Sequence, residues 1–363
     1  MKKKVLAVLM VAALSVGVVA GCGGKEEAPA ASAPSTSAPS TSAPAASDAP
    51  AAAADEYVLK CGSTTPDTHP YNLGIVRLSE LLQEKTDGAA RVDMFGSSQL
   101  GGERDLIEGL QLGTVEMCVI STAPLSGFTD AFLVFDLPFI FATNEQARAT
   151  MDSEVGTEIL NSVTEQGLIG VCWFENGFRN VSNNVRPINT PEDLKGLKIR
   201  TMENQMHMAC FSIMGADPTP MAMGEVFTAC QQGTIDGQEN PVPIIESNKL
   251  DEVQKYISLT GHLFSPAPVF VGQTYYDTLP ADVQTAIMEA GQEAVAYQRE
   301  QIDAQNASGA EIMAERTGCQ INEVDKAPFQ AATAPIYDEW IADEAGKVSP
   351  AIYERVMEVV KAN

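Results

Sequence analysis

From Tyr57 onward, strand patterns and helix patterns alternate along the chain, and this alternation restricts the fold more than any other feature of the sequence. Residues 57–61 and 91–95 have the character of strands, and residues 71–85 between them carry apolar side chains at helical spacing. A further helix is expected at about 103–112. This rhythm predicts an α/β protein with a largely parallel sheet, helices on both faces, and ligands beyond the carboxyl ends of the strands.

Two features suggest that the fold has two similar lobes. The run Gln111–Glu116 (QLGTVE) recurs as Gln231–Asp236 (QQGTID), each time where a helix closes and a strand opens. Residues 281–317 contain no proline and have the composition of one helix, which would be about 55 Å long at the usual rise per residue. Such a helix is too long for one lobe, so it either bridges both lobes or is cut at Gly291 and Gly309.

The amino terminus has the features of an export signal. Three lysines, Lys2 to Lys4, precede a run of apolar and small residues from Val5 to Gly21, and the run ends in Val-Ala-Gly-Cys at Cys22. This ending resembles a bacterial lipobox. We therefore predict a lipoprotein signal peptide at residues 1–21 and acylation of Cys22, which places the mature protein outside the cytoplasm on a lipid anchor. An ordinary signal peptide with a neighbouring cysteine is the alternative.

A low-complexity segment follows the lipobox. Every residue from Ala28 to Ala54 is Ala, Pro, Ser or Thr except Asp48, so the segment cannot bury a core. We interpret residues 22–55 as the lipidated cysteine and a disordered tether, with an average span of roughly 30 Å. The folded domain is expected at residues 56–363. No later apolar run is long enough to span a bilayer.

Charge and residue usage exclude several classes of function. Lys and Arg number 23 against 48 Asp and Glu, which gives a formal net charge of −25, and such a field repels nucleic acids and anionic lipid surfaces. The three histidines are widely separated, and the chain has no C-x-x-C motif, nucleophile elbow or phosphate loop. We therefore expect no enzyme, no metal and no cofactor. The six cysteines after Cys22 are expected to be buried thiols, with one disulfide left open.

Two arginines are the informative polar residues. Arg200 ends a short predicted strand, and Arg179 lies in the run Glu175–Asn180 (ENGFRN), whose Asn-Gly pair is a turn signal. A guanidinium meets a carboxylate with two parallel hydrogen bonds, so an anionic ligand is a natural partner. Pairing with surface carboxylates is the ordinary alternative. Asn240, before Pro241, has the donors and the acceptor to orient a carboxylate or a hydroxyl.

Five runs of residues support a resemblance to a known family. In chain order they are Ser97–Gly102 (SSQLGG), Asn176–Arg179 (NGFR), Asp193–Arg200 (DLKGLKIR), Met214–Met221 (MGADPTPM) and Gly237–Pro241 (GQENP). Together they resemble the solute-binding proteins of tripartite ATP-independent periplasmic (TRAP) transporters of the DctP type. The similarity covers essentially all of residues 56–363. It implies a two-lobed periplasmic-binding-protein-like fold with a ligand cleft between the lobes and a long helix spanning both.

The resemblance also implies a binding site. In the family, the arginine that ends the G-L-K-I-R motif clamps the ligand's carboxylate, and Arg200 matches it. Arg179 matches an assisting arginine, and Asn240 matches the asparagine that helps to hold the same carboxylate. Four softer candidates match more variable pocket positions, namely Glu103, Ser121, Met223 and His69. Sialic-acid-binding members carry an acidic residue and a Phe in place of two of these residues, so sialic acid is not favoured.

The function expected from the resemblance is capture of a small organic acid by lobe closure. Lobe I is predicted at about 56–176 and 266–305, and lobe II at about 177–265 and 306–363. The ligand would be a sugar acid, a dicarboxylate or a keto acid, and the receptor would deliver it to the TRAP membrane permease subunits. A sensory receptor of the same fold and an exported sugar-acid enzyme are the alternatives.

Overall fold

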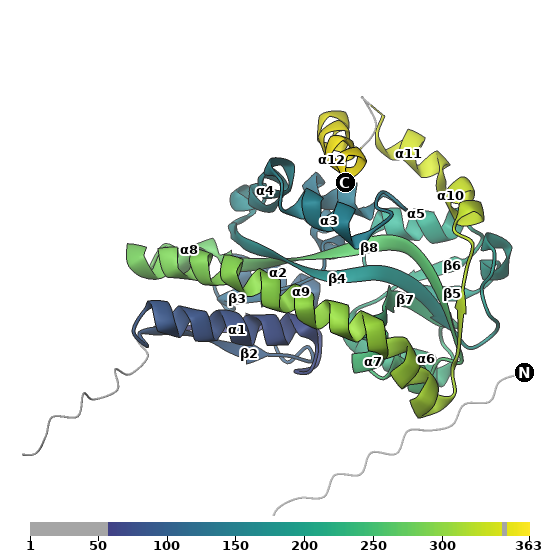
Figure 1. The fold of residues 1–363 in the computed structure, drawn as a ribbon, viewed down its shortest axis with the longest axis horizontal. Coiled ribbons are helices and arrows are strands. Elements are labelled where there is room, and N and C mark those ends of the chain that lie inside the picture. The colour runs from purple at the N-terminus through teal and green to yellow at the C-terminus, as the bar shows by residue number, and fades with distance from the viewer. Residues whose placement is uncertain (1–56, 343–346) are drawn as a thin grey trace, which may run out of the picture. The chain divides into compact units, whose positions relative to one another are not determined.

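The computed structural model describes residues 57–342 and 347–363, so the signal peptide, Cys22 and the tether lie outside the described residues. One nine-stranded sheet runs through the described part, in the order β2-β1-β3-β8-β4-β7-β5-β6, and β9 (Gln320–Glu323) pairs with β8 (Figure 1). Helices cover the sheet, as the alternation of patterns predicts.

The first part of the sheet is a βαβαβ unit. Its elements are β1 (Tyr57–Gly62), α1 (Pro70–Lys85), β2 (Ala90–Phe95), α2 (Glu103–Leu112) and β3 (Met117–Val119). The central strand β1 pairs in parallel with both β2 and β3. The apolar face of α1, including Ile75, Leu78 and Leu82, is fully buried and holds this helix on the sheet.

A second unit repeats this topology. Its elements are β5 (Lys198–Thr201), α5 (Gln205–Ile213), β6 (Asp217–Pro220), α6 (Met223–Gln232) and β7 (Gly237–Pro241). The order β6-β5-β7 matches β2-β1-β3, again with parallel pairing. Gly113 and Gly233 end α2 and α6 with φ of 70° and 67°, the left-handed geometry that favours glycine. The repeated six-residue run therefore marks equivalent positions, and the prediction of two similar lobes is confirmed.

Two long strands join the units. They are β4 (Leu168–Asn183) and β8 (Tyr256–Gly272), which pair with each other in antiparallel orientation. Strand β8 also pairs with β3, and β4 with β7. The expectation of a largely parallel sheet is right within each unit and wrong at the centre, because the chain leaves the first unit along β4 and returns along β8.

Helix α9 (Ala281–Thr317) is one continuous helix of 37 residues that contacts α1, β4 and α7 (Val242–Ser247) (Figure 1). Gly291 and Gly309 do not interrupt it. A β-carbon at Gly291 would lie 2.3 Å from Val171 Cγ1, and one at Gly309 would lie 2.7 Å from Val242 Cγ1. Gly291 thus allows close approach to β4 and Gly309 allows close approach to α7, and α9 spans the two lobes.

The remaining helices complete the layers around the sheet. They are α3 (Asn144–Met151), α4 (Glu154–Asn161), α8 (Gln273–Tyr276), α10 (Ala327–Thr333), α11 (Pro335–Trp340) and α12 (Pro350–Ala362). Short 3₁₀ turns occur at Ala123–Gly127, Ala131–Asp136, Thr164–Gln166, Pro191–Leu194 and Leu250–Glu252. Helix α12 packs on α3 and α4. A buried aromatic group of Phe132, Phe135 and Trp173 lies beneath this layer.

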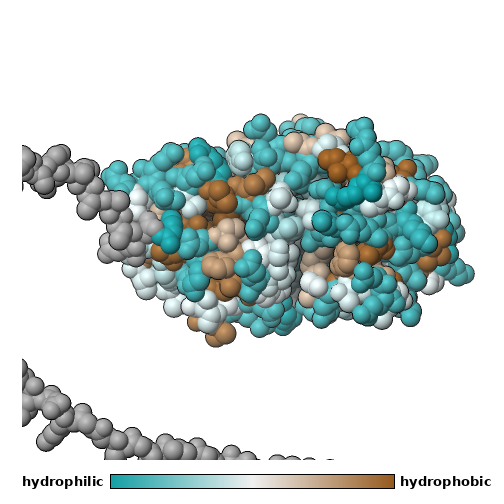
Figure 2. All heavy atoms as spheres, turned by 90° about the horizontal axis from the view of Figure 1, so that it is seen from below, coloured by the Kyte–Doolittle hydropathy of each residue, from teal (hydrophilic) through white to brown (hydrophobic). Residues whose placement is uncertain are grey.

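One face of the described domain is largely hydrophilic, and its cysteines are buried. Figure 2 shows one face, on which hydrophilic side chains predominate and hydrophobic ones form separate patches. Within the residues described, no helix has both the length and the apolar character needed to cross a bilayer. All six cysteines from Cys61 to Cys319 are buried free thiols, which confirms the predicted buried thiols.

Candidate functional site

Equivalent ends of the two βαβαβ units form a cavity of about 170 Å³. Glu103 is the first residue of α2 and Met223 is the first residue of α6, and both line this cavity together with Arg200 from the end of β5. Ligand pockets lie at this carboxyl edge of α/β sheets because helix amino termini and loops converge there. The volume is smaller than the roughly 300 Å³ at which drug-sized pockets begin, so it suits a small molecule.

Arg200 is a buried cation without a paired anion. Its side chain is 3% exposed, and its Nε and Nη2 donate to the Met221 carbonyl at 2.9 and 2.6 Å. Among the residues that the structure describes, none pairs its carboxylate with this guanidinium. Burial lowers the pKa of Arg200 to about 10, while Glu239 and Glu103 oppose that shift from a distance. The side chain therefore stays charged at neutral pH and can receive an anion.

Arg179 lies on β4 and is held from one side. Its Nε and Nη2 donate to the two carboxylate oxygens of Glu239 at 2.5 and 2.7 Å, and Nη2 also donates to Asn240 Oδ1 at 3.1 Å. The side chain is 1% exposed. Its Nη1 is buried without a hydrogen-bond partner in the described part of the chain. Because buried donors are nearly always paired, this free edge suits a ligand oxygen.

A buried chain of hydrogen bonds fixes the Arg179 guanidinium. Glu239 also contacts His262 Nε2 at 3.2 Å, and His262 Nδ1 lies 2.8 Å from the Thr260 hydroxyl. Burial alone would raise the pKa of Glu239, but Arg179 and His262 hold that pKa well below its usual range. Burial lowers the pKa of His262, with Glu239 opposing the shift. An ionised Glu239 can only accept, so the neutral imidazole donates from Nε2.

Glu103 lines the cavity together with Arg200, and Ser121, which is not among the lining residues, holds Glu103 in place. The Ser121 backbone N–H donates to Glu103 Oε1 at 2.6 Å, which ties the first turn of α2 to the chain after β3. Ser121 is 5% exposed. The cavity thus presents a carboxylate whose orientation is fixed by a backbone donor.

Tyr71 and His69 add two buried polar atoms at the start of α1. The Tyr71 N–H donates to His69 Nδ1 at 3.2 Å, so the other ring nitrogen, Nε2, carries the proton. Burial lowers the pKa of His69 to about 3, so the ring is neutral. Burial first, and Glu103 second, raise the pKa of Tyr71 well above its usual value. Neither His69 Nε2 nor Tyr71 Oη has a hydrogen-bond partner of normal geometry within the described ranges, although the Ser121 side chain acts on the Tyr71 hydroxyl and lowers its pKa.

The structure connects most of the predicted site residues. Arg179 bonds directly to Asn240, Glu103 bonds directly to Ser121, and Arg200 and Met223 line the cavity with Glu103. Arg179, Asn240, Ser121 and His69 are not among the residues that line the cavity, and the His69 ring contacts its neighbour Tyr71 at the start of α1. No group of three His, Cys, Asp or Glu side chains among the described residues could hold a metal ion.

Sequence reasoning missed three residues of the site. Glu239 stands inside the GQENP run, where a carboxylate two residues before proline signals a constrained position. His262 and Tyr71 carry no local signal, because an isolated histidine and an aromatic residue in the first turn of a helix are common in cores. Their role depends on contacts between elements distant in the chain.

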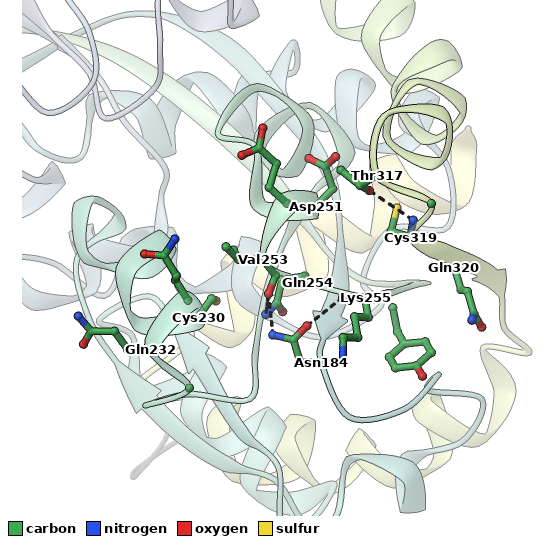
Figure 3. A pocket seen from close by; sticks show the side chains of 15 residues that line it. Asn184, Cys230, Gln232, Asp251, Val253, Gln254, Lys255, Thr317, Cys319 and Gln320 are labelled. Carbon is green, nitrogen blue, oxygen red and sulfur yellow. Dashed lines mark hydrogen bonds between the residues drawn. The ribbon is translucent and has the colours of Figure 1, made fainter.

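A larger and more open groove of about 900 Å³ lies elsewhere and contains none of these residues. Figure 3 shows its lining, which comes from the ends of α6 and α9 and the start of β8. Its polar groups bond to one another; Asn184, for example, donates to the Val253 carbonyl and accepts from the Lys255 N–H. The groove therefore lacks the unpaired buried cation that marks the smaller cavity.

Comparisons with known proteins agree with this geometry. The DctP family model, described as bacterial extracellular solute-binding protein, family 7, matches residues 61–344. Among solved structures, a TRAP periplasmic solute-binding protein from Polaromonas sp. JS666 bound to D-erythronate is 40% identical in sequence, with a TM-score of 0.79. The comparison covers 83% of this chain and 98% of that one.

Two curated relatives have named ligands. The 2,3-diketo-L-gulonate-binding periplasmic protein YiaO of Escherichia coli (strain K12) is 35% identical over 274 residues, which cover 76% of this chain and 84% of the relative. The C4-dicarboxylate-binding periplasmic protein DctP of Rhodobacter capsulatus is 32% identical over 293 residues, which cover 79% of this chain and 87% of the relative.

Proposed function

Because the chain belongs to the DctP family of bacterial extracellular solute-binding proteins, the receptors of TRAP transporters, we propose that it captures a small organic acid and delivers it to a membrane permease. The relatives support the class of ligand, since their names and bound molecules are sugar acids and carboxylates. The family consists of ligand-binding transport receptors, and the two-lobed fold is the one that its solved members share.

The observation that carries the proposal is the buried charge of Arg200. The cation is removed from water, held in place by the Met221 carbonyl, and left without a paired carboxylate in the cavity. A carboxylate ligand supplies the missing counter-charge and can accept two parallel hydrogen bonds from a guanidinium. The free Nη1 of Arg179 and the amide of Asn240 lie on a connected network and suit the same head group.

The mechanism that we propose is capture by closure. Lobe I would comprise about 56–176 and 266–305, and lobe II about 177–265 and 306–363. Arg200, Arg179 and Asn240 then belong to lobe II, and Glu103, Ser121 and His69 to lobe I. A ligand bound first by the arginines would be covered when lobe I closes, which excludes water and strengthens each charged hydrogen bond.

Replacement of Arg200 tests the proposal. We expect Arg200→Ala to weaken binding of the acid by several hundredfold or more, because loss of one partner of a buried charge pair costs about 3–5 kcal/mol. Arg200→Lys should also bind much more weakly, since an ammonium lacks the planar fork. Isothermal titration calorimetry of the purified protein against sugar acids, keto acids and dicarboxylates measures both effects.

An exposed arginine provides the matched control. Arg77 lies on the surface of α1 and pairs with Glu80, so Arg77→Ala removes the same charge without reaching the cavity. This variant should bind as the wild-type protein does. Circular dichroism checks that each variant is folded. Retained tight binding in a folded Arg200→Ala protein would refute the clamp.

We also propose that the receptor is held outside the cytoplasm by a lipid on Cys22. The proposal rests on the lipobox-like ending of the signal peptide and on the tether at residues 22–55. A Cys22→Ala variant should leave the membrane fraction. Persistence of the variant in washed membranes would contradict the lipid anchor.

A further inference from the structure

We propose that Glu103 makes the site selective for polyhydroxy monocarboxylic acids and that it excludes dicarboxylic acids. This inference rests on the proposed function, because it assumes that Arg200 binds one carboxylate of the ligand. The position of Glu103 carries it: the side chain lines the same cavity as Arg200, at the start of the opposing helix α2.

The charges that line the cavity leave room for one ligand carboxylate. Three acidic residues line it, Glu103, Asp105 and Glu203, against two arginines, Arg200 and Arg104; Asp105, Glu203 and Arg104 are exposed, so Glu103 is the least exposed of the three acids. Arg104 is already paired with Glu108 at 3.1 Å, and its side chain is 54% exposed. Once Arg200 holds the first carboxylate, a second one would meet fixed negative charge, and like charges in an enclosed site repel strongly.

The arrangement of Glu103 suits a hydroxyl group. Its Oε1 accepts the Ser121 N–H, and its Oε2 has no hydrogen-bond partner in the described part of the chain. A carboxylate fixed in this way accepts hydrogen bonds from a ligand's O–H groups. It has no proton to donate when ionised, so it cannot bond to another carboxylate.

Two neutral groups extend the same side of the site. The Tyr71 hydroxyl and the His69 Nε2–H are buried and have no hydrogen-bond partner of normal geometry in the described part of the chain, and both Glu103 and the Ser121 side chain act on the Tyr71 hydroxyl. His69 is neutral because its other nitrogen accepts a backbone N–H in a buried position. Uncharged donors of this kind match the oxygens of a polyol and offer no cation for a second acid group. Arg200 therefore selects the acid, and Glu103 with its neutral neighbours selects the hydroxyl chain.

Matched pairs of acids test the inference. D-Erythronate and meso-tartrate have the same four-carbon chain, but D-erythronate ends in a hydroxymethyl group where meso-tartrate ends in a second carboxylate. D-Galactonate and galactarate differ in the same way and have six carbons. In calorimetry with the wild-type protein, the better-bound monoacid should bind at least about tenfold more tightly than its diacid. In Glu103→Gln, which keeps the size and the Ser121 contact, we expect this preference to fall below about threefold.

The control is Glu84→Gln. Glu84 is exposed on α1 and outside the cavity, so this variant loses the same charge without releasing Arg104 from Glu108, and it should keep the wild-type preference. The outcomes separate the two proposals. If no organic acid binds to the wild-type protein, the proposed function fails. If acids bind and lose affinity in Arg200→Ala, but diacids bind as well as monoacids, the proposed function stands and the role of Glu103 is overturned. The wild-type comparison decides this even if Glu103→Gln does not fold.

Discussion

At the scale of single residues, the two buried arginines of the candidate site differ in what holds them. Arg179 is neutralised by Glu239, whose pKa lies well below its usual range because Arg179 and His262 outweigh the effect of burial. Arg200 bonds to a backbone carbonyl and keeps an unbalanced charge. Removing Glu239 would leave a second unpaired cation, so this residue stabilises the fold and orients the site at once.

Buried neutral histidines should make stability depend on pH. The pKa of His69 falls from 6.5 to about 3 on folding, and burial lowers the pKa of His262 as well. The unfolded chain therefore binds protons below about pH 6.5 that the folded protein does not, and stability is lost as pH falls. We expect the free energy of unfolding to be nearly constant between about pH 7 and 8, above which the raised pKa values of buried cysteines such as Cys61 and Cys118 make it fall again. Below pH 6.5 it should drop by up to about 1.4 kcal/mol per pH unit for each histidine.

Urea denaturation between about pH 7.5 and 4.5 measures this slope. Glu239 contributes to the slope of the unfolding free energy only at the acid end of this pH range, because its stabilising charge is lost below the unfolded pKa of about 4.3. In His69→Gln the amide retains a donor and an acceptor but does not titrate, so the slope should become shallower. An unchanged slope in this variant would show that His69 is not the titrating group.

At the scale of elements, α9 depends on two close contacts. We expect Gly309→Ala to destabilise the protein by about 1–3 kcal/mol, although alanine is the better helix former, because the new methyl group would collide with Val242 Cγ1. Ser308→Ala is the matched control, since Ser308 is exposed on the same turn and the change should be neutral or slightly stabilising. Thermal unfolding of both variants checks the difference. A Gly309→Ala protein as stable as the control would mean that α9 does not need this contact.

Some helices and strands could be predicted from the sequence alone, and others could not. Helices α1 and α2 and strands β1 and β2 follow from periodicity and from stop signals such as Gly113, so their predicted bounds agree with the structure within a residue or two. The central antiparallel pair could not be predicted in this way. Strands β4 and β8 are buried along most of their length, and their direction depends on how the two units are joined.

The site was partly predictable for a similar reason. Arg200 and Asn240 belong to sequence motifs that occur in a fixed order along the chain, and an arginine at the end of a strand is a direct candidate for binding a carboxylate. The Tyr71 hydroxyl is a candidate for ligand binding only because the fold brings it near Glu103 of α2, which is distant from Tyr71 in the chain. Contacts of this kind are created by tertiary packing and leave no local pattern.

At the scale of the whole molecule, the sheet continues through both lobes. Strands β4 and β8 pair along most of their length, so opening must deform a hydrogen-bonded ladder. Gln298 of α9 bonds to both the N–H and the carbonyl of Glu175, at 3.0 and 2.7 Å, and so fixes β4 to the helix there. Gly177 follows with a φ of +99° at a register shift. These contacts support the lobe boundary that we propose near residues 176 and 177.

Closure predicts a change in size on binding. Addition of the tightest-binding acid from the calorimetric panel should decrease the radius of gyration measured by small-angle X-ray scattering, because the lobes approach each other. The Arg200→Ala protein should show no decrease at the same concentration of acid. If the wild-type protein binds the acid with no change in the scattering curve, capture occurs without closure.

The register shifts in β4 have one more consequence. Two of the three shifts against β8 lie between Glu175 and Gly177 and between Arg179 and Val181, so Arg179 stands on a short piece of strand between two breaks in the pairing with β8. On its other edge β4 pairs with β7 without a shift, and β7 pairs with β5 at Arg200. Arg179 and Arg200 would therefore keep their relative positions when the lobes that we propose open and close, and the ladder between β4 and β8 would take up the deformation.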